Sequence, residues 1–190
     1  MTNIRSTEFA RQLLASSDVI ASADEIERAI SRLGREMSTR FQESFPIVFA
    51  VMGGAIVFAG KLLPELRFPL DFDYLHATRY GAATSGGAID WLVAPRSDVR
   101  DRQVIVLDDI LDGGHTMHAI RERLLGLGAA NVYSAVLVEK VLSQPKPIHA
   151  DFVGLQVPDR FVFGCGMDAM GYWRNLAEIR ALPSENSQDK

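Results

Sequence analysis

Apolar residues recur at helical spacing in a long segment near the start of the chain. Ser22 precedes Glu25 by three positions, which is the spacing of a capping box at a helix N-terminus. Apolar residues then follow at steps of three and four, as expected for one face of an α-helix. These residues are Ile26, Ile30, Leu33, Met37 and Phe41. The pattern predicts an amphipathic helix that packs against the hydrophobic core through this one apolar face.

The middle of the chain alternates between runs of strand length and runs of helical period. Residues 47–52 form a continuous apolar run, followed by two glycines and by residues 55–63, which are apolar on nearly all sides. We therefore expect a strand, a tight turn and a buried helix. Residues 104–107 start a second such unit, in which a β-branched run and a loop precede an amphipathic helix. Its apolar face comprises Met117, Ile120, Leu124 and Leu127. Three further segments have the pattern of strands: residues 70–77, 88–93 and 132–138.

Strand, crossover helix and strand occur twice, which predicts an α/β fold with a mainly parallel, twisted sheet flanked by helices. Ligands of such sheets bind beyond the carboxyl ends of the strands. Residues 151–158 and 160–168 contain short strand-like runs without a long helix, so we expect the last third to form a small hood or flap. We expect one domain over residues 1–183 and a disordered tail over 184–190, because the tail is polar and lacks apolar anchors.

Composition narrows the class of protein. Of the 190 residues, 47% are hydrophobic and 23% are charged, and no segment has the roughly 18 consecutive apolar residues of a membrane helix. The formal net charge of −4 argues against a protein that wraps nucleic acid. The single cysteine, Cys165, cannot form an internal disulfide, and the first residues lack the apolar core of a signal peptide. We expect a cytoplasmic protein whose partners are small molecules rather than nucleic acid or a membrane.

Residues 104–116 place groups that suit a phosphorylated ligand directly after an apolar strand. Gly113 and Gly114 allow backbone amides to approach an anion closely. With His115 and Thr116 they open a helix, and the N-terminus of a helix favours negative charge. Three or four such amides hold a phosphate without a lysine, which fits the acidic composition of the chain.

Two adjacent carboxylates, Asp108 and Asp109, follow the apolar run. On opposite sides of the strand end, they can accept hydrogen bonds from paired hydroxyls, as on a ribose, or bind Mg²⁺ directly or through water. Taken singly, these residues and Asp112 are as readily explained as turn and cap residues. Taken together they favour a ligand site, because two buried carboxylates repel each other unless a cation or hydroxyl groups bridge them.

Two other patterns point to different chemistry. Asp112, His115 and His118 recur every three residues, so they either face one side of a helix start as a metal triad or serve as caps with a solvent-facing histidine. Residues 164–169 match a glycine pattern of dinucleotide-binding proteins. Only 21 residues follow them, too few for the rest of a βαβ unit of about 30 residues.

The segment 104–116 resembles the phosphoribosyl-diphosphate (PRPP) signature of the type I phosphoribosyltransferases, in which a strand ends in two acidic residues and a D-x-G-x-T loop holds the 5′-phosphate. The rest of the chain is similar to the 6-oxopurine branch of that family, the hypoxanthine-guanine phosphoribosyltransferases. The matching pieces stand in the family's order. They are Met52-Gly53-Gly54, Arg79-Tyr80-Gly81, Lys140, residues 151–168 and Trp173-Arg174.

The resemblance implies a role for each matching residue. Asp112 is implied to be the catalytic carboxylate that handles the proton on purine N7. The implied PRPP-binding residues are Asp108, Asp109, Gly113, Gly114, His115, Thr116, Gly53, Gly54 and Arg174, and the implied Mg²⁺ lies near Asp108, Asp109 and Asp168. The implied purine-binding residues are Lys140, Phe161, Val162 and Asp168. Arg79 and Tyr80 are implied to belong to a mobile lid in the stretch 79–87.

The implied activity is purine salvage, in which the phosphoribosyl group of PRPP passes to hypoxanthine or guanine and gives IMP or GMP and pyrophosphate. This chemistry needs a base for the purine, donors for the leaving pyrophosphate and a lid that excludes water. Two alternatives stay open: a regulatory protein that kept the fold and binds nucleic acid or a partner, and a metal-dependent hydrolase built on the Asp-His-His triad. A homodimer or homotetramer is the expected assembly.

Overall fold

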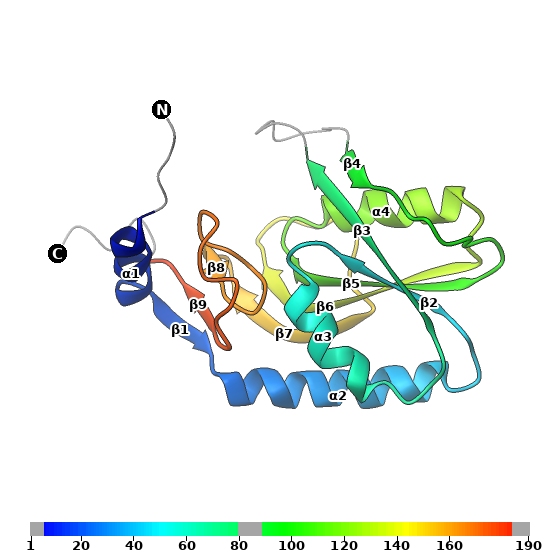
Figure 1. Cartoon of the computed structure of the whole chain (residues 1–190), viewed down its shortest axis with the longest axis horizontal. Coiled ribbons are helices and arrows are strands. Elements are labelled where there is room, and N and C mark those ends of the chain that lie inside the picture. The colour runs from blue at the N-terminus through cyan, green and yellow to red at the C-terminus, as the bar shows by residue number, and fades with distance from the viewer. Residues whose placement is uncertain (1–5, 80–88, 184–190) are drawn as a thin grey trace.

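Six strands form the main sheet, in the order β4–β3–β2–β5–β6–β7 (Figure 1). The computed structural model describes residues 6–79 and 89–183. Every neighbouring pair in this sheet is parallel except the edge strand β4, which pairs antiparallel with β3. The mainly parallel sheet is therefore confirmed. Its strands are β2 (Ile47–Val51), β3 (Asp71–Arg79), β4 (Ile89–Val93), β5 (Gln103–Leu111), β6 (Asn131–Val141) and β7 (Phe152–Pro158).

Helices cover both faces of the sheet (Figure 1). Helix α2 (Ala23–Phe41) and helix α3 (Ile56–Leu62), which continues into the short 3₁₀ helix η1 (Leu63–Glu65), share one hydrophobic core with the sheet. Helix α4 (His115–Gly126) shares the other. The predicted capping box is present, since the backbone N–H of Ser22 donates to Glu25 Oε2 at 2.8 Å and Ser22 Oγ accepts from the backbone of Glu25. The five apolar residues of the predicted stripe are all buried.

Strand β5 lies in the middle of the sheet and is buried on both faces. Val104 and Val106 pack in the α4 core, whereas Ile105 and Leu107 pack in the α2 and α3 core. The strand runs to Leu111, further than its apolar run predicts, because its pairing with β6 continues to that residue. Asp108 and Asp109 therefore lie within β5, near its carboxyl end, rather than in the loop that follows.

One prediction about the last third of the chain is wrong. Residues 152–158 do not belong to a hood but form β7, which pairs in parallel with β6. The strand covers the edge that β6 would otherwise expose. Its own backbone is then protected by α2, because Arg32 Nη2 donates to the carbonyl oxygens of Val153 and Gly154 at 2.9 and 2.6 Å. Helix and edge strand thus close this side of the sheet.

A second, smaller sheet forms the hood, in the order β1–β9–β8. Its strands are β1 (Asp18–Ala21), β8 (Val162–Phe163) and β9 (Ile179–Ala181). The hood therefore combines both ends of the chain, whereas the sequence pattern indicated the C-terminal part alone. Helix α1 (Thr7–Ala15) packs beside it, where Trp173 Nε1 donates to the carbonyl of Ala10 at 2.7 Å. Figure 1 shows α1 and β1 next to β8 and β9.

None of the helices within residues 6–79 and 89–183 is long and apolar enough to cross a membrane.

Candidate active site

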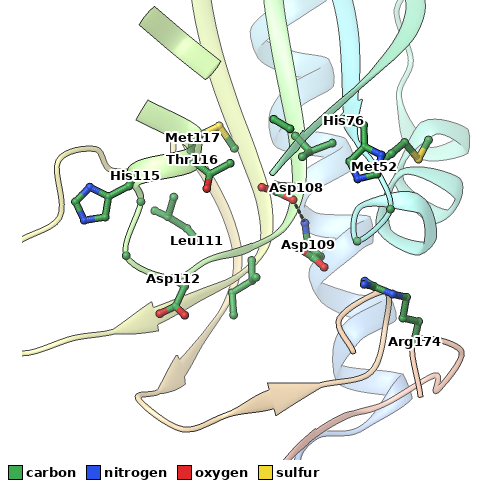
Figure 2. A pocket seen from close by; sticks show the side chains of 17 residues that line it. Met52, His76, Asp108, Asp109, Leu111, Asp112, His115, Thr116, Met117 and Arg174 are labelled. Carbon is green, nitrogen blue, oxygen red and sulfur yellow. Dashed lines mark hydrogen bonds between the residues drawn. The ribbon is translucent and has the colours of Figure 1, made fainter. Parts of the chain in front are cut away.

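A cavity of about 460 Å³ lies beyond the carboxyl ends of the central strands (Figure 2). It is bounded by the loop after β2, by the end of β3, by the end of β5 with the loop that follows, and by Arg174 from the hood. Predicted residues that line it are Gly53, Gly54, Asp108, Asp109, Asp112, Gly113, Gly114, His115, Thr116 and Arg174. The structure thus brings together all the residues that the sequence assigned to PRPP.

The loop between β5 and α4 presents its amides at the cavity. Gly114 is the N-cap of α4 and has a φ of 79°, a left-handed conformation that favours glycine. The first N–H groups of a helix have no acceptor within the helix. Among the described residues, no hydrogen bond outside the regular helices and strands takes up the amides of Gly113, Gly114, His115 or Thr116. These donors are available to an anion.

The acid pair lies at the floor of this cavity. Asp109 is 8% exposed, and its backbone N–H donates to Asp108 Oδ1 at 2.9 Å. Burial, followed by the charge of Asp109, raises the pKa of Asp108 well above its usual value. Burial also raises the pKa of Asp109, although the hydrogen bond with Asp108 and the charge of Arg174 act in the opposite direction. A cation or hydroxyl donors would relieve this repulsion.

The glycine pair after β2 approaches the acid pair closely, and the peptide bond between Met52 and Gly53 is cis. A Cβ atom on Gly54 would lie 1.9 Å from Asp109 Oδ2. On the other side, a Cβ on Gly166 would lie 1.9 Å from the carbonyl oxygen of Gly54, and Gly166 has a φ of 106°. The β2 loop is therefore held between the carboxylate of Asp109 and the hood.

Arg174 closes the hood side of the cavity. Its Nη1 donates to the carbonyl of Gly166 at 2.6 Å, and its guanidinium forms an ion pair with Asp168. Asp168 Oδ2 also accepts from the backbone N–H of Gly171 at 2.6 Å. About half of the Arg174 side chain remains exposed, so the guanidinium keeps donors for an anion in the cavity.

A second cavity of about 210 Å³ adjoins the first. The two share Asp109, Ile110, Asp112 and Arg174. The smaller cavity is also lined by all four residues predicted to bind a purine, namely Lys140, Phe161, Val162 and Asp168. Two cavities that meet at a carboxylate suit a reaction between two substrates.

Lys140 lines the smaller cavity. Its side chain is 12% exposed, and its Nζ lies 3.1 Å from Asp112 Oδ2 and 3.9 Å from Asp159 Oδ1. The ring of Phe161 is half-exposed at the rim, while Val162 is buried beside it in β8. The ammonium of Lys140 is thus oriented by carboxylates and faces a cavity with an aromatic wall.

Some predictions fall outside these cavities, and some lining residues were not predicted. Tyr80 lies outside the described residues, and Arg79 is the last residue of β3, so the predicted lid stays a prediction. His76 and Met167 line the cavities although the sequence analysis did not single them out. His76 was recognisable as a polar residue near the carboxyl end of a parallel strand.

The metal triad proposed from the sequence is not formed. Across residues 6–79 and 89–183, no three or more histidine, cysteine, aspartate or glutamate side chains are grouped as metal ligands. Asp112, His115 and His118 therefore do not make the site of a metal-dependent hydrolase. The acid pair at Asp108 and Asp109 remains the place where substrate oxygens and two carboxylates can share a cation.

Comparison with known proteins identifies the class to which this fold and site belong. The sequence model of the phosphoribosyl transferase domain matches residues 16–170. A hypoxanthine-guanine phosphoribosyltransferase of Bacillus subtilis is 32% identical, over 86% of this chain and 92% of its own length. One of Streptococcus pneumoniae is 30% identical, over 88% of this chain and 93% of its own.

Solved structures agree with the sequence relatives. A hypoxanthine-guanine phosphoribosyltransferase from Bacillus anthracis superposes with a TM-score of 0.82 at 26% identity, covering 87% of this chain and 98% of that one. A hypoxanthine phosphoribosyltransferase from Staphylococcus aureus has the same fold, with a TM-score of 0.85 at 22% identity over 98% of this chain and all of that one. The chain belongs to the hypoxanthine-guanine branch of the phosphoribosyltransferase family.

The packing of the β2 loop against the hood gives a first prediction. Gly166→Ala should lower the free energy of unfolding by about 2–4 kcal/mol, because the added methyl group meets the Gly54 carbonyl in a left-handed backbone. Gly53→Ala is the matched control, since a Cβ there meets nothing within 4 Å. Urea unfolding measures both. Equal losses in the two variants would contradict the packing argument.

The acid pair gives a prediction about pH. Because the pKa of Asp108 is raised in the folded chain, the folded state holds its proton to higher pH than the unfolded chain does, and stability falls as pH rises through that interval. Asp108→Asn should therefore unfold at higher urea concentration than the parent at pH 7, with the gain disappearing toward about pH 4.

The control is Asp98→Asn. Asp98 is exposed, and hydrogen bonds from Arg100 lower its pKa to about 2, so its neutralisation should give no gain at pH 7. If Asp108→Asn and the parent unfold at the same urea concentration at pH 7, burial of the Asp108 carboxylate does not lower the free energy of unfolding, and the prediction is wrong.

Proposed function

We propose that the protein transfers the phosphoribosyl group of PRPP to a 6-oxopurine, hypoxanthine or guanine, and releases pyrophosphate. The observation that carries this proposal is the meeting of two cavities at Asp112, one with an amide cradle and an acid pair, the other with Lys140 and Phe161. A sugar phosphate bound in the first cavity and a planar base bound in the second would meet at the carboxylate of Asp112. The curated relatives, named as enzymes of this kind, give the same assignment.

The 5′-phosphate of PRPP is assigned to the loop 112–116. Each amide that donates to a charged oxygen contributes roughly 1.5–3 kcal/mol, so the donors of Gly113, Gly114, His115 and Thr116 suffice without a lysine. The ribose hydroxyls would then donate hydrogen bonds to the carboxylates of Asp108 and Asp109. In this assignment the anomeric carbon of the sugar would face the second cavity.

The residues present fit Mg²⁺ as the cofactor. Two buried carboxylates with raised pKa values lie at the cavity floor, and Mg²⁺ is commonly held by one or two carboxylates together with substrate phosphates. When bound, Mg²⁺ would neutralise charge on the pyrophosphate as it leaves. Asp108 and Asp109 are assigned to hold it. Asp168, the third carboxylate expected near the metal, lines only the smaller cavity and pairs with Arg174, and within the described residues it does not group with the acid pair as a third ligand.

The leaving pyrophosphate is assigned to Arg174 and to the amides of Gly53 and Gly54. Arg174 is already fixed by the carbonyl of Gly166 and by Asp168. Such a donor, oriented before the reaction, stabilises charge that develops on the leaving oxygens without reorganising. The lid predicted at Arg79 and Tyr80 would exclude water from the activated sugar.

The purine is assigned to the smaller cavity. Phe161 would stack on the ring, the backbone of Val162 would contact its edge, and Lys140 would donate to the 6-oxygen. Asp112 Oδ2 accepts from Lys140 at 3.1 Å, so the group that binds the 6-oxygen and the group that takes the N7 proton orient each other. The attacking ring nitrogen is a better nucleophile once that proton is removed.

The alternative of a regulatory protein that binds nucleic acid is not favoured, because the residues assigned to PRPP and those assigned to the purine line two adjoining cavities. A homodimer or homotetramer and a cytoplasmic location stay predictions from the sequence.

The direct test follows nucleotide formation from PRPP with each of hypoxanthine, guanine, xanthine and adenine, with and without Mg²⁺. We expect IMP or GMP and pyrophosphate in the presence of Mg²⁺, and little product from adenine. A protein that forms no nucleotide from any of the four purines would refute the proposal.

Asp112→Asn should lower turnover by about 10²–10⁴-fold, because the carboxylate that accepts the purine proton is lost. The effect on the KM for PRPP should be smaller, since the loop amides are retained. Asp159→Asn is the control: it neutralises the other carboxylate near Lys140, at 3.9 Å, but lies outside the phosphate loop. Steady-state kinetics distinguish them, and parental turnover in Asp112→Asn would exclude the residue as the base.

Lys140→Ala should reduce the preference for hypoxanthine over adenine by about 10–100-fold, because a 6-amino group cannot accept the hydrogen bond that a 6-oxygen accepts. The KM for PRPP should change less. Lys61→Ala, which removes a lysine paired with Glu27 on the helical face, is the control. Competition between the two bases measures the preference, and an unchanged ratio would show that Lys140 does not read the 6-position.

A further inference from the structure

Lys146 is a buried lysine that lines neither of the two cavities. Its side chain is 7% exposed, although a charged lysine is rarely this buried without partners. Its Nζ lies 2.6 Å from the carbonyl oxygen of Lys140, 3.0 Å from that of Leu111 and 3.3 Å from Glu139 Oε1. Each of its three donors has an acceptor.

These acceptors belong to two strands. Leu111 is the last residue of β5 and directly precedes Asp112. Lys140 lies near the end of β6, and its own side chain reaches Asp112. The ammonium of Lys146 therefore bridges two backbone carbonyls. One belongs to Leu111, which precedes the proposed base Asp112, and the other belongs to Lys140, the proposed donor to the purine. Leu111 pairs with Glu139 at the last register position of the β5–β6 ladder, and Lys140 follows directly after that position in β6.

The stem of Lys146 also lies beside the phosphate loop. A Cβ on Gly114 would lie 3.5 Å from Lys146 Cβ and 3.3 Å from Ile148. The loop after β6 thus packs against the N-terminus of α4 as well as against the ends of β5 and β6. The ammonium thus holds the strand ends through hydrogen bonds, whereas the phosphate loop lies next to the apolar stem alone.

Glu139 supplies the opposite charge. It is 14% exposed and lies next to Lys140 in β6. Carbonyl oxygens offset only part of the cost of burying an ammonium, and the carboxylate of Glu139 offsets more of it.

We propose that Lys146 is a positioning residue for base recognition, which sets the relative orientation of Asp112 and Lys140 by bridging Leu111 and Lys140. This inference rests on the proposed function. Lys146 touches neither cavity, so it acts through Lys140 and Asp112 rather than on the substrates.

Lys146→Met tests the bridge, because it keeps the apolar stem and removes the three donors. We expect the KM for hypoxanthine to rise and the preference over adenine to fall, each by about 5–50-fold, with the KM for PRPP within about twofold of the parent. A residue needed only for stability would lower the amount of active protein without moving the ratio between two bases.

Arg102→Met is the matched control. Arg102 makes the same kind of bridge at the opposite end of the sheet, donating to the carbonyl of Phe45 at 2.9 Å and to Asp71 Oδ2 at 2.8 Å. It should lose stability while the base preference stays parental. If Lys146→Met also keeps the parental preference, or changes kcat and both KM values by one common factor, the proposal is refuted.

A second variant covers the case in which Lys146→Met does not fold. Lys146→Arg keeps the charge, but no single guanidinium nitrogen has the three N–H donors with which Nζ reaches both carbonyls and Glu139. The preference over adenine should again fall, and a parental preference in this variant would then overturn the proposal. A parent that forms no nucleotide from PRPP refutes the proposed function, whereas a parent that turns over hypoxanthine beside variants with unchanged preference refutes only the role of Lys146.

Discussion

Two carboxylates are held next to each other at the end of the central strand, although both are largely removed from water and carry the same charge. Burial raises the pKa of Asp108 and of Asp109, so the fold bears a cost that a hydrophobic strand end would avoid. The surrounding backbone is arranged around this pair. Gly54 leaves room for Asp109, Gly166 leaves room for Gly54, and the positive charge of Arg174 acts on Asp109. Pairs of this kind are typical of sites where a ligand completes the electrostatics.

The same strand end connects the two halves of the site. Asp112 borders both cavities, and its partner Lys140 comes from the neighbouring strand β6. Because parallel strands end at one edge of the sheet, a base-binding group on β6 and a phosphate loop after β5 are brought together without a long connection. Lys146 then links the two strand ends at the point where their ladder stops.

The hood contributes the third wall, and it depends on both ends of the chain. Strands β1 and β9 pair antiparallel, and Trp173 is anchored to α1 through the carbonyl of Ala10. This fixes the segment that carries Asp168 and Arg174. The hood also shares its buried residues with the core beneath α2 and α3, so the position of Arg174 is tied to the packing of the main sheet.

The local sequence pattern was sufficient to predict most helices and strands and the loop between β5 and α4. The capping box at Ser22, the buried run of β5 and the glycines before α4 act over a few neighbouring residues, so they are readable from the chain alone. The order of the motifs was also sufficient to assign Lys140, Phe161, Val162 and Asp168 to one substrate, and these residues do line one cavity.

The local sequence pattern did not determine which sheet a strand joins, or where in that sheet it lies. Residues 152–158 have the same short strand pattern whether they form a hood or an edge strand, and β1 became part of the hood only through pairing with β9, about 160 residues away along the chain. The contacts of Lys146 and the lining role of His76 likewise arise between segments that are distant in sequence, because hydrogen bonds across strand ends depend on which strands become neighbours.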